Sequence, residues 1–190
     1  MSPLAIWKAR IANLPAQLSF WKFPIDSRSV FHTTELSFAF TNLKPVIPGH
    51  VLVSPIRVVD RLSDLSTDEV ADLFVCARFV GDVILKTHPH ADSLTFTVQD
   101  GSSAGQSVKH VHVHVMPRWP TDRFNESVIG NDSVYEEINQ AEVKMGQALP
   151  KVDESVLEPD RSRDDMIAEA TSLRVAIERV LRDTEESVVT

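Results

Sequence analysis

Three histidines alternate with valines in one short stretch of the chain, where the residues run Val108-Lys109-His110-Val111-His112-Val113-His114-Val115-Met116. In a β-strand, residues two apart share a face, so the spacing predicts three imidazoles on one side and the valines on the other. Neighbouring imidazoles would then lie roughly 6.5 to 7 Å apart, from a rise of about 3.3 Å per residue. A neutral imidazole is a nucleophile near neutral pH, so the segment is a candidate site of covalent catalysis.

Two other interpretations use the same histidines. They could form the polar face of an ordinary half-exposed strand, although three in register make this the weaker interpretation. Three imidazoles can also bind zinc, but the outer pair on one strand would lie roughly 13 Å apart, too far for an ion with Zn–N bonds of about 2.0 Å. We therefore favour attack on phosphorus by the central His112, with the outer histidines donating hydrogen bonds or a proton.

A loop rich in glycine and serine precedes the histidines and is a candidate phosphate site. Gly101 and Gly105 allow the backbone to approach an anion closely. The successive amides of Gly105, Gln106, Ser107 and Val108 would form a cradle for a phosphate. Such a loop alone is more often only a turn, and its place directly before the histidines favours the anion site.

The residues around this site predict β-strands. Apolar runs at residues 36–40 and 51–53, joined by a turn rich in proline and glycine, predict an antiparallel hairpin. Leu94, Phe96 and Val98 alternate with polar residues, which is typical of a strand with one buried face.

Two helices are also predicted. Apolar residues spaced three and four apart, opened by Ser66 and Glu69 in a capping box, predict a helix over residues 67–87. A second, amphipathic helix begins near Ser162, where Asp165 completes a cap.

These patterns divide the chain into five parts. We expect an N-terminal extension over residues 1–19, a catalytic domain over 20–119, an exposed and partly mobile loop over 120–160, the amphipathic helix over 161–183 and a tail over 184–190.

Composition excludes several classes of protein. The chain has 190 residues, enough for one globular domain, and its net charge of -8 argues against a general nucleic-acid binder. No apolar stretch is long enough to span a membrane. A single cysteine, Cys76, fits a reducing compartment, so we expect a cytoplasmic protein, with the nucleus as a second location.

The segments Gln99-Asp100-Gly101, Ala104 to Lys109 and His110 to His114 together resemble the histidine triad (HIT) superfamily, specifically its Fhit branch. The stretch from Glu35 to Val53, which contains Asn42 and Lys44-Pro45-Val46-Ile47-Pro48-Gly49-His50, resembles the same branch. The resemblance implies an α+β fold with a mainly antiparallel sheet, one central helix and a C-terminal helix, and it implies a homodimer.

The resemblance also implies an activity, the hydrolysis of diadenosine triphosphate or tetraphosphate to AMP and the remaining nucleotide. It implies no organic cofactor, and a magnesium or manganese ion would arrive on the substrate phosphates. His112 matches the nucleophile that becomes adenylylated, and His114 matches the histidine at the scissile phosphate. His110 and His50 match supporting histidines.

Other positions match substrate contacts of the family. Asn42 matches the residue that contacts the ribose, and Gln99 and residues 105–108 match the phosphate-contacting positions. Phe23 stands where the family has a histidine that can touch substrate, which puts that contact in doubt.

Alternatives to this activity share the same nucleophile or the same binding site. A nucleoside phosphoramidase or adenylylsulfate hydrolase would differ only in the leaving group. A nucleotide-binding signalling protein would act through the bound complex, with incidental turnover.

Overall fold

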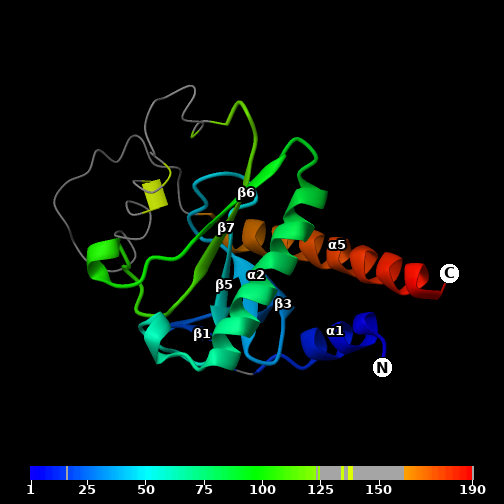
Figure 1. The fold of residues 1–190 in the computed structure, drawn as a ribbon, viewed down its shortest axis with the longest axis horizontal. Helices are drawn as coiled ribbons and strands as arrows, with labels where there is room; N and C mark the ends of the chain where they lie inside the picture. The colour runs from blue at the N-terminus through cyan, green and yellow to red at the C-terminus, as the bar shows by residue number, and fades with distance from the viewer. Residues whose placement is uncertain (16, 123, 125–133, 135–136, 139–160, 190) are drawn as a thin grey trace.

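A computed structural model of the chain describes residues 1–15, 17–122, 124, 134, 137–138 and 161–189 (Figure 1). The helices are α1 (Pro3–Ala12), α2 (Thr67–Thr87) and α5 (Arg163–Val189). The strands are β1 (Ser19–Phe20), β2 (Phe23–Pro24), β3 (Val30–Thr33), β4 (Ser37–Thr41), β5 (Val51–Pro55), β6 (Ser93–Thr97) and β7 (Val113–Arg118). Three short 3-10 helices complete the described elements: η1 (Ser27–Ser29), η2 (Leu62–Asp64) and η3 (Ser102–Ala104).

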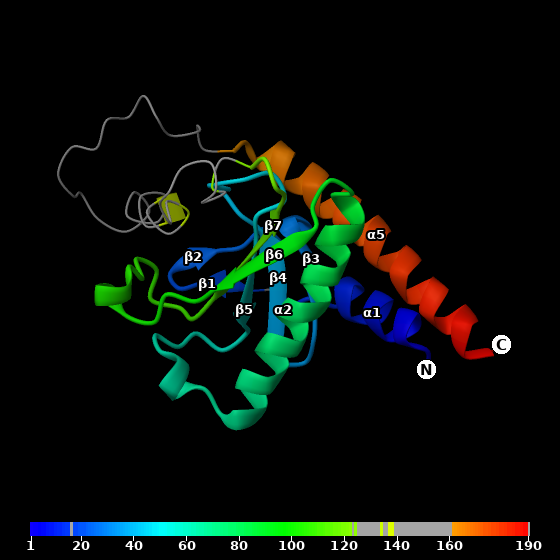
Figure 2. The same ribbon diagram turned by 45° about the horizontal axis from the view of Figure 1, so that its top comes forward.

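Five strands form one antiparallel sheet in the order β3-β4-β5-β7-β6, and β1 and β2 form a separate hairpin. The helices lie on one side of the sheet and the β1–β2 hairpin lies on the other (Figure 2). This arrangement confirms the predicted α+β class, its antiparallel sheet and its two helices. In the described part of the chain, no helix has the length and apolar character needed to cross a membrane.

The central helix begins and ends where the sequence predicts. The Ser66 side chain accepts a hydrogen bond from the backbone of Glu69, and the Glu69 carboxylate accepts one from the backbone of Ser66. Apolar residues of α2 then pack into the main core with valines of β5 and β7. The capping box and the apolar stripe thus place this helix as the sequence predicts.

The prediction that the histidine segment forms one strand from Val108 is wrong. β7 begins only at Val113, because the preceding residues bond elsewhere. The backbone N–H of Val111 donates to the carbonyl of Val59 (2.8 Å), and the Ser54 hydroxyl donates to the carbonyl of Val111 (2.7 Å). Both partners are distant in sequence, so the spacing alone could not reveal the break.

The prediction of one buried face over Leu94, Phe96 and Val98 is confirmed only in part. Leu94 and Val98 are partly buried and pack against the main core, whereas Phe96 on the edge strand β6 is 42% exposed. Leu94 and Phe96 lie over Gly81 of α2, where a Cβ atom would come within 2.7 Å of the Phe96 ring. The glycine lets the helix approach this strand closely.

Both ends of the chain are more ordered than predicted. α5 runs to Val189, so the tail expected from residue 184 is helical, and the N-terminal extension contains α1. The Glu185 carboxylate accepts a hydrogen bond from the backbone of Leu4 (2.8 Å), and Trp7 is buried in the main core. This long-range contact explains why a local pattern missed the last turns of α5.

Most of the loop predicted over residues 120–160 lies outside the described residues. At four described positions the expected exposure is wrong, because Asp122, Phe124, Val134 and Ile138 are buried. The three apolar members pack in a small core that also contains Val46, Ile47 and Met116.

Candidate active site

Four buried imidazoles meet on the face of the sheet away from the helices. His110, His112, His114 and His50 are each at most 1% exposed. The ring centroids of His112 and His114 are 4.7 Å apart, and those of His50 and His114 are 5.1 Å apart. The rings are closer than the predicted strand spacing because the chain bends before β7.

The surroundings of His112 fix its tautomer. Its Nδ1 lies 2.8 Å from the backbone carbonyl of His110, which can only accept a hydrogen bond. Nδ1 therefore carries the hydrogen, and in the neutral ring Nε2 keeps its lone pair. Phe20 packs edge-on against this ring at 5.0 Å and holds its orientation. The arrangement prepares Nε2 as a nucleophile.

A hydrogen-bonded chain orients His114. The backbone N–H of Val46 donates to Nδ1 of His50 (3.2 Å), so His50 carries its hydrogen on Nε2. That nitrogen lies 2.9 Å from Nδ1 of His114 and donates to it. His114 then carries its own hydrogen on Nε2, the nitrogen that points away from His50. It can donate a hydrogen bond to a substrate oxygen.

His110 is held as a neutral ring between two backbone groups. Its Nδ1 accepts a hydrogen bond from the backbone of Trp21 (3.2 Å), and its Nε2 donates to the carbonyl of Pro55 (3.0 Å). Burial lowers the pKa of His110 to about 4. It therefore supports His112 through its carbonyl and carries no charge itself.

The glycine-rich loop is organised by Gln106. Its side chain accepts from the backbone of Gly101 (2.8 Å) and donates to the carbonyls of Asp60 and Val108. The backbone amides of Gly105 and Gln106 donate to carbonyls inside the loop. Two of the four amides predicted to bind phosphate are thus engaged inside the loop, and the phosphate contacts of residues 105–108 remain a prediction.

Asp100 anchors the start of this loop. Its carboxylate pairs with Arg61 (3.1 Å), and the Arg61 guanidinium lowers its pKa. The register of β6 on β7 pairs Thr97 with His114, and its continuation would place the buried Gln99 opposite His112. The predicted contact of Gln99 with phosphate remains a prediction.

Asn42 connects the histidines to a cavity of about 750 Å³. Its Nδ2 lies 3.3 Å from Nε2 of His50, and its Oδ1 accepts from the backbone of Lys44. The cavity is lined mainly by apolar side chains, among them Phe20, Phe23, Ile25, Phe40 and Leu52. An apolar cavity of this size with a few polar groups suits a nucleoside.

Some residues of the site gave no usable signal in the sequence. Phe20 packs on His112, and Trp21 reaches His110 through its backbone with a φ of 55°. Arg163 and Met166 of α5 line the cavity although they lie more than 110 positions after Asn42. Only the tertiary fold brings these four residues to the site.

The fold and the histidine geometry define a known class of protein. The model of the HIT domain family matches residues 25–121, so the chain belongs to the HIT family. Within that family, it is similar to Fhit-type enzymes.

The chain is 40% identical over 165 residues to the Arabidopsis thaliana "Bifunctional bis(5'-adenosyl)-triphosphatase/adenylylsulfatase FHIT", with 87% of each chain covered. It is 50% identical over 129 residues to an asymmetrical bis(5'-nucleosyl)-tetraphosphatase of Schizosaccharomyces pombe, covering 68% of this chain and 67% of the relative. The crystal structure of Plasmodium falciparum diadenosine triphosphate hydrolase in complex with cyclomarin A has a TM-score of 0.66 and 25% identity, over 88% of both chains.

Proposed function

We propose that the protein hydrolyses dinucleoside polyphosphates to AMP and the remaining nucleotide through an adenylyl group on His112. The observation that carries this proposal is the hydrogen bond from Nδ1 of His112 to the carbonyl of His110. It leaves the lone pair of the neutral ring on Nε2, and the Phe20 ring that packs on His112 also lines a nucleoside-sized cavity. The names of similar enzymes in plants and yeast support the same chemistry.

The reaction has two displacements at the α-phosphorus. In the first, a bond forms between Nε2 of His112 and phosphorus while the bond to the leaving nucleotide breaks. His114 donates a hydrogen bond to the oxygen that gains negative charge. In the second, water attacks the same phosphorus, the nitrogen–phosphorus bond breaks, AMP leaves and the proton of water passes to solvent.

The proposal also includes a preference among possible substrates. Similar proteins are named for triphosphates, tetraphosphates and adenylylsulfate, and all three present an α-phosphorus to the same nucleophile. We favour diadenosine triphosphate over adenylylsulfate. Faster turnover of adenylylsulfate in a direct comparison would reverse this order.

A divalent cation and a second copy of the chain complete the proposal. Magnesium or manganese would arrive on the substrate phosphates, and turnover that is unchanged by EDTA would contradict this role. We also propose a homodimer, since the edge strand β6 carries the exposed Phe96. Light scattering that gives the 21.2 kDa mass of one chain would contradict the dimer.

Trapping the intermediate tests the mechanism. Purified protein is mixed briefly with diadenosine triphosphate, quenched and analysed by mass spectrometry. We expect an added adenylyl group on His112 that decays as AMP appears, and none in His112→Asn. Hydrolysis without an adduct, even in a slowed variant such as His114→Asn, would point to direct attack by water.

A further inference from the structure

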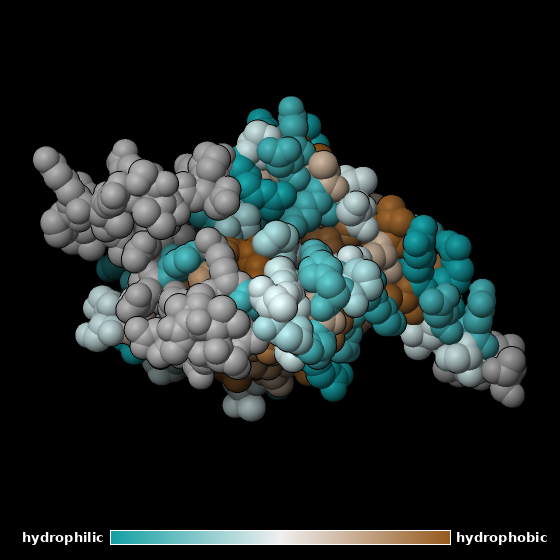
Figure 3. Space-filling model, turned by 90° about the horizontal axis from the view of Figure 1, so that it is seen from above, coloured by the Kyte–Doolittle hydropathy of each residue, from teal (hydrophilic) through white to brown (hydrophobic). Residues whose placement is uncertain are grey.

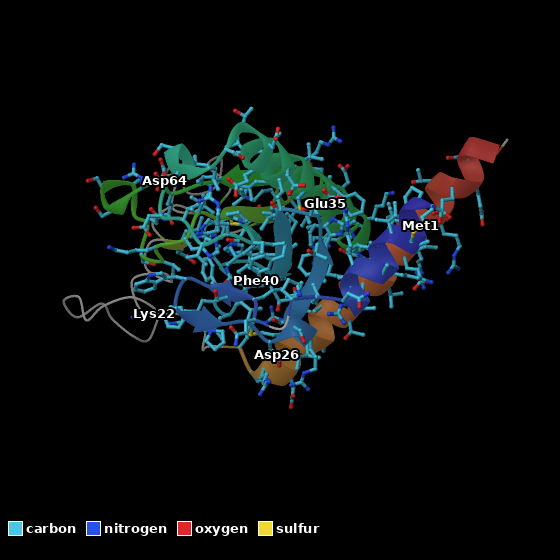
Figure 4. All side chains as sticks on the ribbon, turned by 90° about the horizontal axis from the view of Figure 1, so that it is seen from below. Met1, Lys22, Asp26, Glu35, Phe40 and Asp64 are labelled. Carbon is cyan, nitrogen blue, oxygen red and sulfur yellow. The ribbon has the colours of Figure 1, made fainter. Side chains whose placement is uncertain are left out.

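The start of α5 is attached to two segments that line the nucleoside cavity. Nε of Arg163, in the first turn of the helix, lies 2.6 Å from Oδ2 of Asp26. Figure 4 shows Asp26 beside the first turn of α5, with Phe40 nearer the centre of the molecule. Just before the helix, the backbone N–H of Arg161 donates to the carbonyl of Leu43 (3.1 Å). Asp26 and Leu43 both line the cavity, so the start of the helix holds two of its walls.

The Arg161 side chain fastens the second of these contacts to the helix. Its Nη1 forms an ion pair with Glu169 (2.6 Å), and its Nη2 donates to the carbonyl of Asp165 (3.2 Å). The side chains of Arg161 and Glu169 are each 20% exposed, so salt and water screen this pair less than a pair on the open surface. Nη1 also makes a long contact of 3.5 Å with the carbonyl of Asn42. One guanidinium group thus joins α5 to the loop that follows β4.

This loop carries Asn42, which the family resemblance places at the ribose. The Oδ1 atom of Asn42 accepts a hydrogen bond from the backbone of Lys44 (3.0 Å), so its side chain is fixed relative to its own loop. The carbonyls of Asn42 and Leu43 are the groups that Arg161 contacts, so the backbone of the loop is held by α5. A hydrogen bond weakens when its distance or angle leaves a narrow range. The position of this backbone therefore decides how well Asn42 can bind a ribose.

We propose that Arg161 is a positioning residue that holds Asn42 at the ribose of the bound nucleotide. Among the described residues that line the cavity are Asn42, Leu43 and Arg163, but not Arg161, which therefore acts through the loop. The inference rests on the proposed nucleotide hydrolysis, since only a bound nucleotide brings a ribose to Asn42. It predicts a loss of affinity that is confined to ligands with ribose hydroxyl groups.

Calorimetry with AMP and with 2′,3′-dideoxy-AMP, which lacks the ribose hydroxyls, tests the inference without requiring turnover. Wild type should bind AMP more tightly than the dideoxy nucleotide. In Arg161→Ala we expect AMP affinity to fall about fivefold, as for the loss of one hydrogen bond, and dideoxy-AMP affinity to change less than about twofold. Arg182→Ala is the matched control, because Arg182 pairs with Glu178 on the same helix at an exposed position. It should bind both ligands as wild type does.

Two further variants test the route of the effect. Glu169→Gln keeps Arg161 but weakens the ion pair that holds it, so it should show the same selective loss of AMP affinity to a smaller extent. Asn42→Ala should also weaken AMP binding. Adding Arg161→Ala to Asn42→Ala should weaken it by less than about twofold more, because the two residues serve one contact. Thermal unfolding shows that each variant is folded before it is titrated.

The contrary results are distinct. An equal loss for AMP and dideoxy-AMP in Arg161→Ala, or no loss for either, would overturn the role of Arg161 alone. Losses of AMP affinity that add fully in the double variant would also overturn it, because Arg161 would then act independently of Asn42. Failure of the wild-type protein to bind AMP or to hydrolyse a dinucleoside polyphosphate would overturn the proposed hydrolysis as well.

Discussion

The two faces of the five-stranded sheet use the same strands for different purposes. On the helix face, Val113 and Val115 are fully buried against α2 in an apolar core. On the opposite face, His112 and His114 are equally buried but engaged in hydrogen bonds. Burial therefore does not distinguish the two faces, whereas hydrogen bonding does.

Along this short segment, the valines on one face stabilise the fold and the histidines on the other face serve the reaction. A buried valine stabilises the fold by removing apolar surface from water, and this effect does not depend on its orientation. An imidazole in this cluster can serve the reaction only when its N–H groups point in the right directions, which its hydrogen-bond partners determine. Substitutions on the helix face should therefore lower stability, and substitutions of the clustered histidines should lower turnover.

The largest effect is expected at the nucleophile. His112→Asn should lower turnover about 10⁴-fold or more, since little chemistry remains without the attacking nitrogen. The melting temperature should change little, because the substituted amide can keep a hydrogen bond to the carbonyl of His110. Steady-state kinetics and thermal unfolding measure the two effects. A variant that retains more than a tenth of wild-type turnover would contradict the mechanism.

A histidine on the helix face should affect stability in acid instead. His32 packs on Phe79, and burial, with the charge of Arg10, lowers its pKa to about 4, whereas nearby Asp72 raises it. The unfolded chain then binds more protons between about pH 4 and 6.5, so stability falls as the pH falls through this window. The loss from His32 is about 3 kcal/mol, and buried His110 acts in the same direction.

Urea unfolding between pH 4 and 7 measures this dependence. His32→Leu should reduce the loss in acid, while His90→Leu, at an exposed position, should leave it unchanged. An identical pH dependence in wild type and His32→Leu would refute the assignment.

The chain that orients His114 should have an intermediate effect on activity. His50→Leu removes the donor to Nδ1 of His114 and should lower kcat about 100-fold. His50→Gln retains an amide donor and should recover part of this loss. Equal kcat values for the two variants would show that the hydrogen bond does not matter.

The smallest effect is expected from the valine beside the nucleophile. Val113→Ala opens a small space in the main core and should lower the free energy of unfolding by about 2 kcal/mol. Its kcat should stay within about threefold of wild type, because the backbone and the histidines are unchanged. A large loss of kcat without a loss of stability would show that the two faces are coupled.

The parts of the fold that the sequence predicts are those with local causes. α2 follows from the Ser66 capping box and an apolar stripe, and the β4–β5 hairpin follows from its apolar runs and turn. The four histidines meet as the family resemblance implies. Each of these features depends on residues close in sequence or on a specific motif.

The missed features depend on contacts between distant residues. The bend before Val113 depends on Val59 and Ser54, and the last turns of α5 depend on Leu4. Arg163 likewise lines the cavity only because α5 packs against α2, β3 and β4. The space-filling view shows mostly hydrophilic side chains along the outer part of α5 and hydrophobic ones where it joins the body (Figure 3).

The bonded loop before the histidines has a consequence for the thermodynamics of binding. Gln106 closes the loop through three hydrogen bonds, and Gly101 and Gly105 already occupy positive φ angles. The loop therefore holds its shape without a ligand, and a phosphate bound there would order little additional backbone. The conformational entropy cost from the protein would then be small, and the main cost of binding would be desolvation of the phosphate.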